Sequence, residues 1–358
     1  MFDSIKSLIG VQSYLGVDIG TTSIKIAEIS KGKRRPKIEN YGVLESYGHL
    51  ERINDAIQTA GLKIMEKETA ELLKLLLKRL KIKSKDVIAS IPAFSVFITS
   101  LEIPEMSEVD MAKTMSFQIS QHIPLPVQEV AIEWLKVGER DDESGFTKQQ
   151  ILVVSIPNEL ISRYQTIFKL AGLKLKALEV ESLSLARALG DNNPAPSLFV
   201  DIGGRSTNIS VVEKGFLKYN NHTDFAGGSL TQAISSGLNI NIRRAEELKK
   251  QRGLLGAGGE FELSTLIFPF LDAIINESNK ARIVFEKNQG GRIERVLLAG
   301  GGANLLGIEK YFEEQINLPV TIGNPFLKLE YPARIEPIVK ELGPSFSVAI
   351  GLGIKEFI

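Results

Sequence analysis

Apolar and polar positions follow the same order at two places that lie far apart in the chain. Lys25 to Ile29 and Asn208 to Val212 read polar and apolar in turn, and each stretch follows an apolar run, Tyr14 to Val17 and Ser197 to Val200. Alternation is typical of a half-buried strand, and a short apolar run bounded by a turn is typical of a buried one. Each place therefore predicts a strand, a tight turn and a second strand.

The two predicted hairpins also share their turn sequence. Asp18-Ile-Gly-Thr-Thr-Ser-Ile-Lys-Ile26 aligns without a gap on Asp201-Ile-Gly-Gly-Arg-Ser-Thr-Asn-Ile209, and the match extends to Lys31-Gly32 against Lys214-Gly215. Chance can produce one such segment, but two in register indicate a duplicated domain.

Apolar residues at helical spacing predict several helices. The clearest stripe consists of Leu72, Leu73, Leu76, Leu77 and Leu80, opposite Lys74, Lys78, Arg79 and Lys81. Such a pattern is typical of an amphipathic helix that covers a core. Further helices are predicted at Glu159–Ala171, which ends at Gly172, at Leu178–Leu189 and at Ile308–Gln315.

The region between the hairpins shows a different pattern of short apolar segments. Val87 to Ile103 predicts two short strands broken by Pro92, and Ile151 to Ile156 predicts a buried strand. We interpret residues 87–175 as an inserted subdomain. The segment Asp191-Asn-Asn-Pro-Ala-Pro196 is rich in turn-forming residues and predicts a hinge before the second repeat.

These boundaries predict two lobes. The first-lobe core is residues 1–86, completed by 176–193 and 340–358, and the second-lobe core is 194–230, completed by 291–339, with a helical subdomain at 231–290. The length of 358 residues suits two domains.

Composition excludes several functions. The 43 basic and 43 acidic residues give no net charge, so nothing global favours nucleic acid or an anionic membrane, although a local patch stays possible. The chain has no cysteine and three scattered histidines, which excludes disulfides and argues against a zinc site. No apolar run approaches the roughly 20 residues of a spanning helix. Met1 to Tyr14 predicts a short docked helix, with a membrane-surface contact as the alternative, and we expect a cytoplasmic location.

The repeated turns have the chemistry of a phosphate site. Glycine lets successive backbone N–H groups converge on a phosphate, and hydroxyls of Thr21, Thr22, Ser23, Ser206 and Thr207 are donors. Asp18 and Asp201, at the strand ends, are candidate Mg²⁺ ligands, usually through water. One hairpin from each lobe would hold the phosphates of ATP between them.

A third glycine-rich element supports the nucleotide hypothesis. Gly300, Gly301, Gly302 and Ala303 follow a predicted buried strand and would let a purine and ribose lie on the backbone. Each motif alone also fits a plain hairpin or a flexible loop, and the specificity comes from their order. The chain lacks both the Walker A pattern and the dinucleotide fingerprint.

These motifs resemble those of the actin, sugar-kinase and heat-shock-chaperone ATPase fold. The segment from Asp18 through Gly20 to Lys25 looks like its first phosphate motif, and that from Asp201 through Gly203, Gly204 and Arg205 to Thr207 looks like its second. Leu298 to Gly307 resembles the adenosine motif. Gly227 and Gly228 resemble its nucleotide-side glycine pair, and Glu246 and Lys249 resemble residues that touch ribose and adenine. Glu179–Leu189 and Ser345–Gly353 look like its connecting helices.

The resemblance implies an α/β, actin-like (ribonuclease H-like) bilobal fold with duplicated α/β domains and a small inserted α+β subdomain. Within it the chain resembles the PilM family of type IV pilus assembly proteins most closely, with FtsA as a cousin. Three stretches carry this resemblance: Phe117–Trp134 with its His-Ile-Pro-Leu-Pro turn, Leu178–Leu189, and Gly227–Ile234 with the Ala-Glu-Glu-Leu-Lys-Lys that follows. FtsA has a C-terminal membrane helix, and this sequence ends at Ile358 without one.

The PilM resemblance implies a partner. In such proteins a groove bordering the inserted subdomain takes the cytoplasmic tail of the membrane protein PilN, so membrane association would be indirect. Other pilus platform proteins and motor ATPases are further expected partners, and nucleic acid is not. Phe94, Val96, Phe97, Met111 and Met115 are candidate groove residues, although each also fits a plain core position.

The sequence leaves open whether the protein hydrolyses ATP. Asn208 stands where chaperones and FtsA carry an aspartate, and no water-positioning residue is assigned. We expect slow or absent turnover, with ATP acting as a conformational ligand. The alternatives are a filament-forming protein of the FtsA or MreB type and a small-molecule kinase of the same fold, for which residues 34–60 show no sugar pocket.

Overall fold

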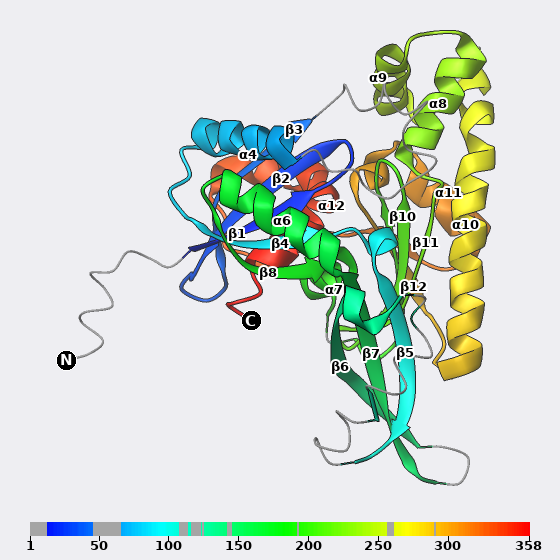
Figure 1. The fold of residues 1–358 in the computed structure, drawn as a ribbon. Coiled ribbons are helices and arrows are strands. Elements are labelled where there is room, and N and C mark those ends of the chain that lie inside the picture. The colour runs from blue at the N-terminus through cyan, green and yellow to red at the C-terminus, as the bar shows by residue number, and fades with distance from the viewer. Residues whose placement is uncertain are drawn as a thin grey trace.

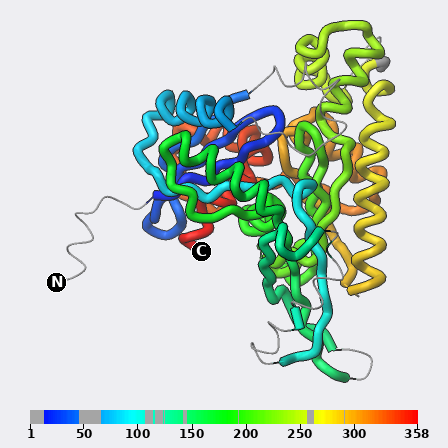
Figure 2. Tube along the Cα trace, viewed as in Figure 1, coloured from blue at the N-terminus to red at the C-terminus, as the bar shows by residue number. Residues whose placement is uncertain are grey.

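The chain folds into two lobes and a narrower extension (Figures 1 and 2). The computed structural model describes residues 13–45, 66–106, 114–115, 123, 125–141, 145–191, 193–255, 261–289 and 291–358. The predicted helix over Met1–Tyr14 lies outside these residues, except for Ser13 and Tyr14, which begin a strand.

The first lobe is built on a five-stranded sheet in the order β3-β2-β1-β4-β8. Its strands are β1 (Ser13–Ile19), β2 (Ser23–Ser30), β3 (Lys37–Glu45), β4 (Asp86–Ile91) and β8 (Lys174–Val180). The strands β1, β2 and β3 are antiparallel neighbours, whereas β1, β4 and β8 run parallel.

The second lobe repeats this sheet in the order β11-β10-β9-β12-β13. Its strands are β9 (Ser197–Ile202), β10 (Thr207–Glu213), β11 (Phe216–Thr223), β12 (Arg295–Ala299) and β13 (Val320–Ile322). Their directions match those of the first sheet. Asp18 pairs with Lys25 in one hairpin and Asp201 with Asn208 in the other, so the duplication predicted from the sequence is confirmed down to the register.

Two helices pack against each other between the lobes: α7 (Glu181–Leu189) and α12 (Glu336–Gly353). Their approach is close, because a Cβ on Gly351 would lie 2.0 Å from the carbonyl oxygen of Ser184. The predicted helix start at Leu178 is wrong, since Leu178 to Val180 pair with β4 as part of β8. The predicted start of the last helix at Ser345 is also too late, because α12 begins at Glu336.

Helices cover the outer faces of both lobes. The helices α4 (Glu66–Leu80) and α6 (Asn158–Leu170) lie side by side on the first lobe, and Leu73, Leu76 and Leu77 of α4 are buried as predicted (Figure 1). The second lobe carries α8 (Gly227–Leu238), α9 (Ile242–Arg252), α10 (Phe261–Gln289) and α11 (Ile308–Ile316). Short 3₁₀ turns are η1 (Ala93–Ser95), η2 (Val127–Glu129), η4 (Gly301–Asn304), η5 (Pro325–Lys328) and η6 (Ala333–Ile335). Among the helices of the described ranges, none is long and apolar enough to cross a bilayer.

A three-stranded antiparallel sheet forms the extension at the bottom of Figure 1. Its strands are β5 (Phe97–Pro104), β6 (Val130–Asp141) and β7 (Thr147–Pro157), in the order β5-β7-β6. The predicted boundaries of the insertion, 87 and 175, are too wide, because β4 and β8 belong to the first sheet and α6 packs on α4. Parallel strands pair across long sequence gaps, which local patterns do not reveal.

The extension docks on the second lobe through polar contacts, one of which is buried. The Lys218 ammonium of β11 donates to the Gln150 side chain of β7 at 2.8 Å, and Ser100 of β5 donates to the Lys218 carbonyl at 2.9 Å. Arg140 of β6 donates to the Asn288 carbonyl at the end of α10. The extension is therefore tied to the lobe that carries the second hairpin.

Candidate nucleotide-binding cleft

A cavity of about 1000 Å³ lies between the two lobes. It brings together almost every residue that the sequence singled out: Asp18, Gly20, Thr21, Thr22, Ser23, Lys25, Asp201, Gly203, Gly204, Arg205, Ser206, Gly227, Gly228, Glu246, Lys249, Gly300, Gly301, Gly302 and Ala303. These residues come from five separate segments, so the convergence is a property of the tertiary structure.

The two repeated turns have the same backbone geometry and face each other. The N–H of Gly20 donates to the Ser23 carbonyl at 2.9 Å, and the N–H of Gly203 donates to the Ser206 carbonyl at 3.1 Å. A Cβ on Gly204 would lie 2.8 Å from the Thr22 side chain, so only glycine allows this approach of the turn tips. Two such turns present backbone N–H groups and hydroxyls from both lobes, as a polyphosphate site needs.

Asp18 is held inside the first lobe by two side chains. The Lys25 ammonium lies 3.2 Å from its carboxylate, and the Ser90 hydroxyl donates to it at 2.8 Å. Burial alone would lower the pKa of Lys25, but the charge and hydrogen bond of Asp18, with smaller contributions from Asp201 and Glu181, raise that pKa. Lys25 therefore carries a positive charge at the base of the cleft.

Two further carboxyls share this one cation. Removal from water, together with the charge of Asp18, raises the pKa of Asp201 to about 7. Removal from water and the charges of Asp201 and Asp18 raise the pKa of Glu181 to about 8, although the backbone N–H of Ala93 donates to Glu181 at 3.0 Å. Three carboxyl groups share one ammonium, and the raised pKa values of Asp201 and Glu181 mean that both favour the protonated form when no further cation is bound.

This surplus of carboxyl groups fits a bound divalent cation that travels with a nucleotide. Among the residues that the structure describes, no three carboxylates or histidines converge closely enough to hold a metal by themselves. Mg²⁺ usually keeps several waters and takes one or two carboxylates plus phosphate oxygens. Asp18 and Asp201 therefore fit as ligands through water, and the turns fit the phosphates.

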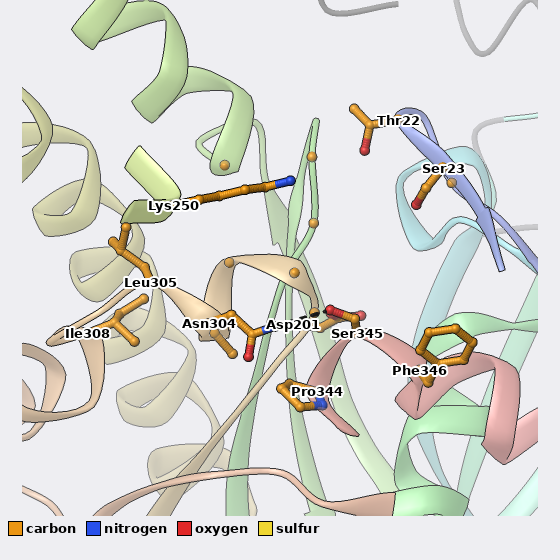
Figure 3. A pocket seen from close by; sticks show the side chains of 18 of the residues that line it. Thr22, Ser23, Asp201, Lys250, Asn304, Leu305, Ile308, Pro344, Ser345 and Phe346 are labelled. Carbon is orange, nitrogen blue, oxygen red and sulfur yellow. Dashed lines mark hydrogen bonds between the residues drawn. The ribbon is translucent and has the colours of Figure 1, made fainter. Parts of the chain in front are cut away.

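The third glycine-rich segment forms the floor of the cleft. Gly300 has φ of 77°, which favours glycine, and its N–H donates to the Pro344 carbonyl at 2.9 Å. A Cβ on Gly302 would lie 2.3 Å from the Ile202 side chain. Asn304 reaches the Ser345 hydroxyl on α12 at 3.4 Å, and Leu305 and Ile308 add an apolar edge beside them (Figure 3).

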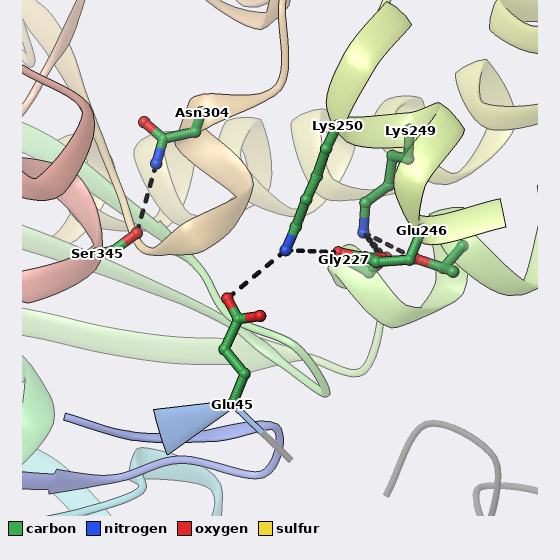
Figure 4. Close-up of polar contacts among 8 residues, drawn as sticks. Glu45, Gly227, Glu246, Lys249, Lys250, Asn304 and Ser345 are labelled. Atoms are coloured by element: carbon green, nitrogen blue, oxygen red, sulfur yellow. Dashed lines mark hydrogen bonds and ion pairs between the residues drawn. The ribbon is translucent and has the colours of Figure 1, made fainter. Parts of the chain in front are cut away.

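Glu246 and Lys249 line the cleft but also bind each other. Their charged groups lie 2.7 Å apart, and the Lys249 ammonium also donates to the Gly227 carbonyl at 2.8 Å and to the Thr231 hydroxyl at 2.7 Å (Figure 4). Burial lowers the pKa of Lys249 more than the charge of Glu246 raises it. The pair joins α9 to the N-terminus of α8, and its contact with ribose and adenine stays a prediction.

Thr207 is the predicted site residue that the cleft does not include. Its side chain is buried and donates to the Phe225 carbonyl at 2.7 Å. Thr207 pairs with Ile202 inside the sheet, beyond the turn, so its hydroxyl faces the protein. Asn208 is buried as well and donates to Ser182 at 2.9 Å, which places it among α7 residues and outside the residues that line the cavity.

Three notable residues that line the cleft were not predicted for the nucleotide site. Glu181 begins α7 at the cleft wall, and Phe94 lies under the Arg205 guanidinium at 4.9 Å. Lys250 of α9 reaches Glu45 at the end of β3 at 3.6 Å and so spans the mouth (Figure 4). A carboxylate directly after a strand at the start of a predicted helix was a signal for Glu181, but the misplaced helix start concealed it.

The candidate groove residues separate into different environments. Phe94 lines the nucleotide cleft, Val96 is buried in the first-lobe core, and Met115 is buried in the small core of the extension. Phe97 on β5 is partly exposed. Met111 lies outside the described residues. Apart from Phe97, the described candidates are therefore not free surface positions.

Duplicated sheets, crossing helices and facing turns define the actin-like ATPase fold, and comparisons with known proteins agree. The structure is similar to that of a PilM-PilN type IV pilus biogenesis complex, with a TM-score of 0.82 at 20% identity, covering 96% of this chain and 98% of that one. It is also similar to MreB5 of Spiroplasma citri bound to ADP, with a TM-score of 0.55 at 15% identity and 96% of each chain covered.

The sequence comparisons give the particular family. The model of the type IV pilus assembly protein PilM family matches residues 16–357, and the chain belongs to this family. It is also 24% identical to cell division protein FtsA of Enterococcus faecalis, over 91% of this chain and 84% of that protein. A match to FtsA of Buchnera aphidicola is 29% identical over 35% of this chain and 36% of that protein.

Proposed function

We propose that this chain binds Mg²⁺-ATP between its lobes and assembles the inner-membrane platform of the type IV pilus by binding the N-terminal tail of a PilN-like membrane protein. The observation that carries the proposal is the family match over residues 16–357, with the likeness to a PilM-PilN complex as support. A cytoplasmic position beside the inner membrane follows from such a partner, and other platform proteins and motor ATPases are expected contacts.

The nucleotide part of the proposal rests on the cleft. Facing glycine turns, an ammonium at Lys25 and a surplus of carboxyl groups suit a polyphosphate with its cation. Turnover is proposed to be slow or absent. Asn208 directly follows the second repeated turn, and its side-chain amide, which donates to Ser182, cannot act as a base for the attacking water.

The extension offers an edge for the tail. Within the described residues, β6 pairs only with β7, and it presents Trp134 (40% exposed) and Leu135 (45% exposed). Both edge strands, β5 and β6, also contact β11, and Ser100 of β5 donates to the Lys218 carbonyl there. An extended peptide adds to a free strand edge through backbone hydrogen bonds, and pockets for alternate side chains give specificity.

A peptide titration tests the partner. A peptide that copies the tail of the PilN-like protein from the same genome is titrated with and without Mg²⁺-ATP, and the fluorescence of Trp134, the single tryptophan, is followed. Saturable binding is expected, and Leu135→Arg should weaken it about tenfold or more. Phe216→Arg, on an exposed residue of β11, is the matched control. Absence of binding in either nucleotide state would refute the partner assignment.

A filament is the second candidate, because the relatives include FtsA and the similar structures include MreB5. Sedimentation with Mg²⁺-ATP separates the two proposals. A pelleted polymer that forms without any peptide would favour the filament, and a protein that stays in the supernatant but binds the tail would favour the pilus adaptor.

A further inference from the structure

The register of the first sheet brings three basic segments to one of its ends. Ser13 pairs with Ser30, and Ser30 with Lys37, so the start of β1, the end of β2 and the start of β3 lie together. The parallel strands β4 and β8 start at the same end, because Asp86 pairs with Lys174. The β2–β3 loop and the segments before β4 and β8 are therefore neighbours, across five strands or about 19 Å.

This end carries nine exposed cations: Lys31, Lys33, Arg34, Arg35, Lys81, Lys83, Lys85, Lys174 and Lys176. Carboxylates lie among them as well: Asp86, at 3.7 Å from Lys176, Glu39, which pairs with Lys37, Glu330, and Glu356 near the C-terminus. The chain as a whole has no net charge, so the positive charge is concentrated locally. We call these nine residues the basic end.

The most basic loop is held in a fixed shape. The carboxylate of Glu330 accepts hydrogen bonds from three successive backbone N–H groups, those of Lys33, Arg34 and Arg35, at 3.4, 2.7 and 3.3 Å. A Cβ on Gly32 would lie 2.0 Å from the Arg35 carbonyl, so the turn needs glycine. Because Glu330 binds the backbone of the loop, the basic side chains of Lys33 and Arg34 stay exposed.

Exposed aliphatic side chains border the basic end. Leu327 is 70% exposed, and the Arg35 guanidinium donates to its carbonyl. Ile358 is 65% exposed, and the ring of its neighbour Phe357 contacts Tyr14 at the start of β1, with 5.8 Å between ring centroids. The C-terminus accordingly lies beside the dark-blue loop between β2 and β3 (Figure 2).

We propose that the basic end binds the surface of an anionic lipid bilayer. Basic residues near such a surface each contribute about 1 kcal/mol of attraction, and exposed aliphatic side chains add contact with the interface. Nucleic acid is the weaker match, because single strands are bound through aromatic stacking platforms and the exposed large side chains here are aliphatic. The contact would add a direct attachment to the indirect one through a membrane partner.

The position of the basic end separates this surface from the cleft. The turns at Gly20 and Thr22 follow the C-terminal end of β1, whereas the basic end lies at the N-terminal end of β1. Charge reversals on the basic end therefore leave the nucleotide site intact. Intact nucleotide binding is a measure of folding for each variant.

The test is flotation of the full chain with protein-free vesicles. One set contains phosphatidylcholine alone and the other about 30% phosphatidylglycerol, each in about 0.05 M and about 0.3 M salt. Binding is expected only with phosphatidylglycerol and is expected to fall at high salt. The double variant Lys31→Glu, Lys83→Glu should lose tenfold or more of the partition. The control Lys280→Glu, Lys287→Glu changes the net charge equally on α10 of the other lobe and should bind like the wild type.

Several outcomes would overturn the proposal. These are no flotation with phosphatidylglycerol at low salt, binding that survives high salt, equal losses in the two double variants, and capture of RNA without capture of vesicles. The vesicles contain no protein, so a negative result leaves the partner assignment to be decided by the peptide titration.

Discussion

Glu181 gives the sharpest prediction, because ionisation of its carboxyl destabilises the folded protein and depends on pH. The perturbation is Glu181→Gln, which removes the charge and keeps an oxygen to accept the hydrogen bond from the Ala93 N–H. The pKa of Glu181 is raised from 4.5 to about 8 in the folded protein. Between these two pH values the folded state therefore keeps a proton on Glu181 that the unfolded state has released. The stability that this carboxyl contributes is fully present below pH 4.5 and is lost as the pH rises towards 8.

The magnitude follows from this interval. One pKa unit corresponds to about 1.4 kcal/mol, so the interval from 4.5 to about 8 sets an upper limit of roughly 5 kcal/mol. Glu181 opens onto the cleft and shares its repulsion with Asp201, so we expect about 2 kcal/mol. For a chain of 358 residues this corresponds to a rise of about 3 °C in Tm.

The assay is thermal unfolding of the nucleotide-free protein between pH 5 and pH 8. The Tm of Glu181→Gln should match that of the wild type at pH 5, where the wild-type carboxyl is protonated, and should exceed it by about 3 °C at pH 8. Saturating Mg²⁺-ATP should reduce the difference, since a cation offsets the repulsion. Glu71→Gln on the exposed face of α4 controls for the change in net charge. A difference that is constant across this pH range, or larger at pH 5, would refute the reasoning.

Two further predictions concern the cleft and the lobe interface. Asp201→Ala should weaken Mg²⁺-dependent ATP binding at least tenfold in calorimetry, because it removes a predicted cation ligand. The control Glu71→Ala should leave the affinity for ATP unchanged. Equal affinities of the two variants would contradict the assignment. Gly351→Ala should destabilise the protein by about 2 kcal/mol or more in urea unfolding, because its Cβ meets a backbone carbonyl. The control Gly237→Ala should cost little stability, because the nearest atoms there belong to the flexible Leu266 side chain. Equal losses of stability in the two variants would show that helix packing is not the cause.

Local sequence predicted the duplicated hairpins well, because a strand, a turn and a strand are specified within about ten residues by alternation and glycine. The turn bonds at Gly20 and Gly203 are the same in both copies, as the aligned sequences implied. Boundaries that depend on long-range pairing were less predictable. Leu178 to Val180 have helical spacing in the sequence but extend as part of β8, since pairing with β4 overrides local propensity.

The sequence by itself determined the repeat, the glycine turns and the absence of cysteine and of a long apolar run, because each is a property of neighbouring residues. Only the tertiary structure decided that Thr207 faces the protein, that Glu181 joins Asp18 and Asp201, and that three separate loops form the basic end. Those outcomes depend on how strands pair and on which residues lose contact with water. Burial and proximity between distant segments set the charges of this cleft, and neither is encoded in a short stretch of chain.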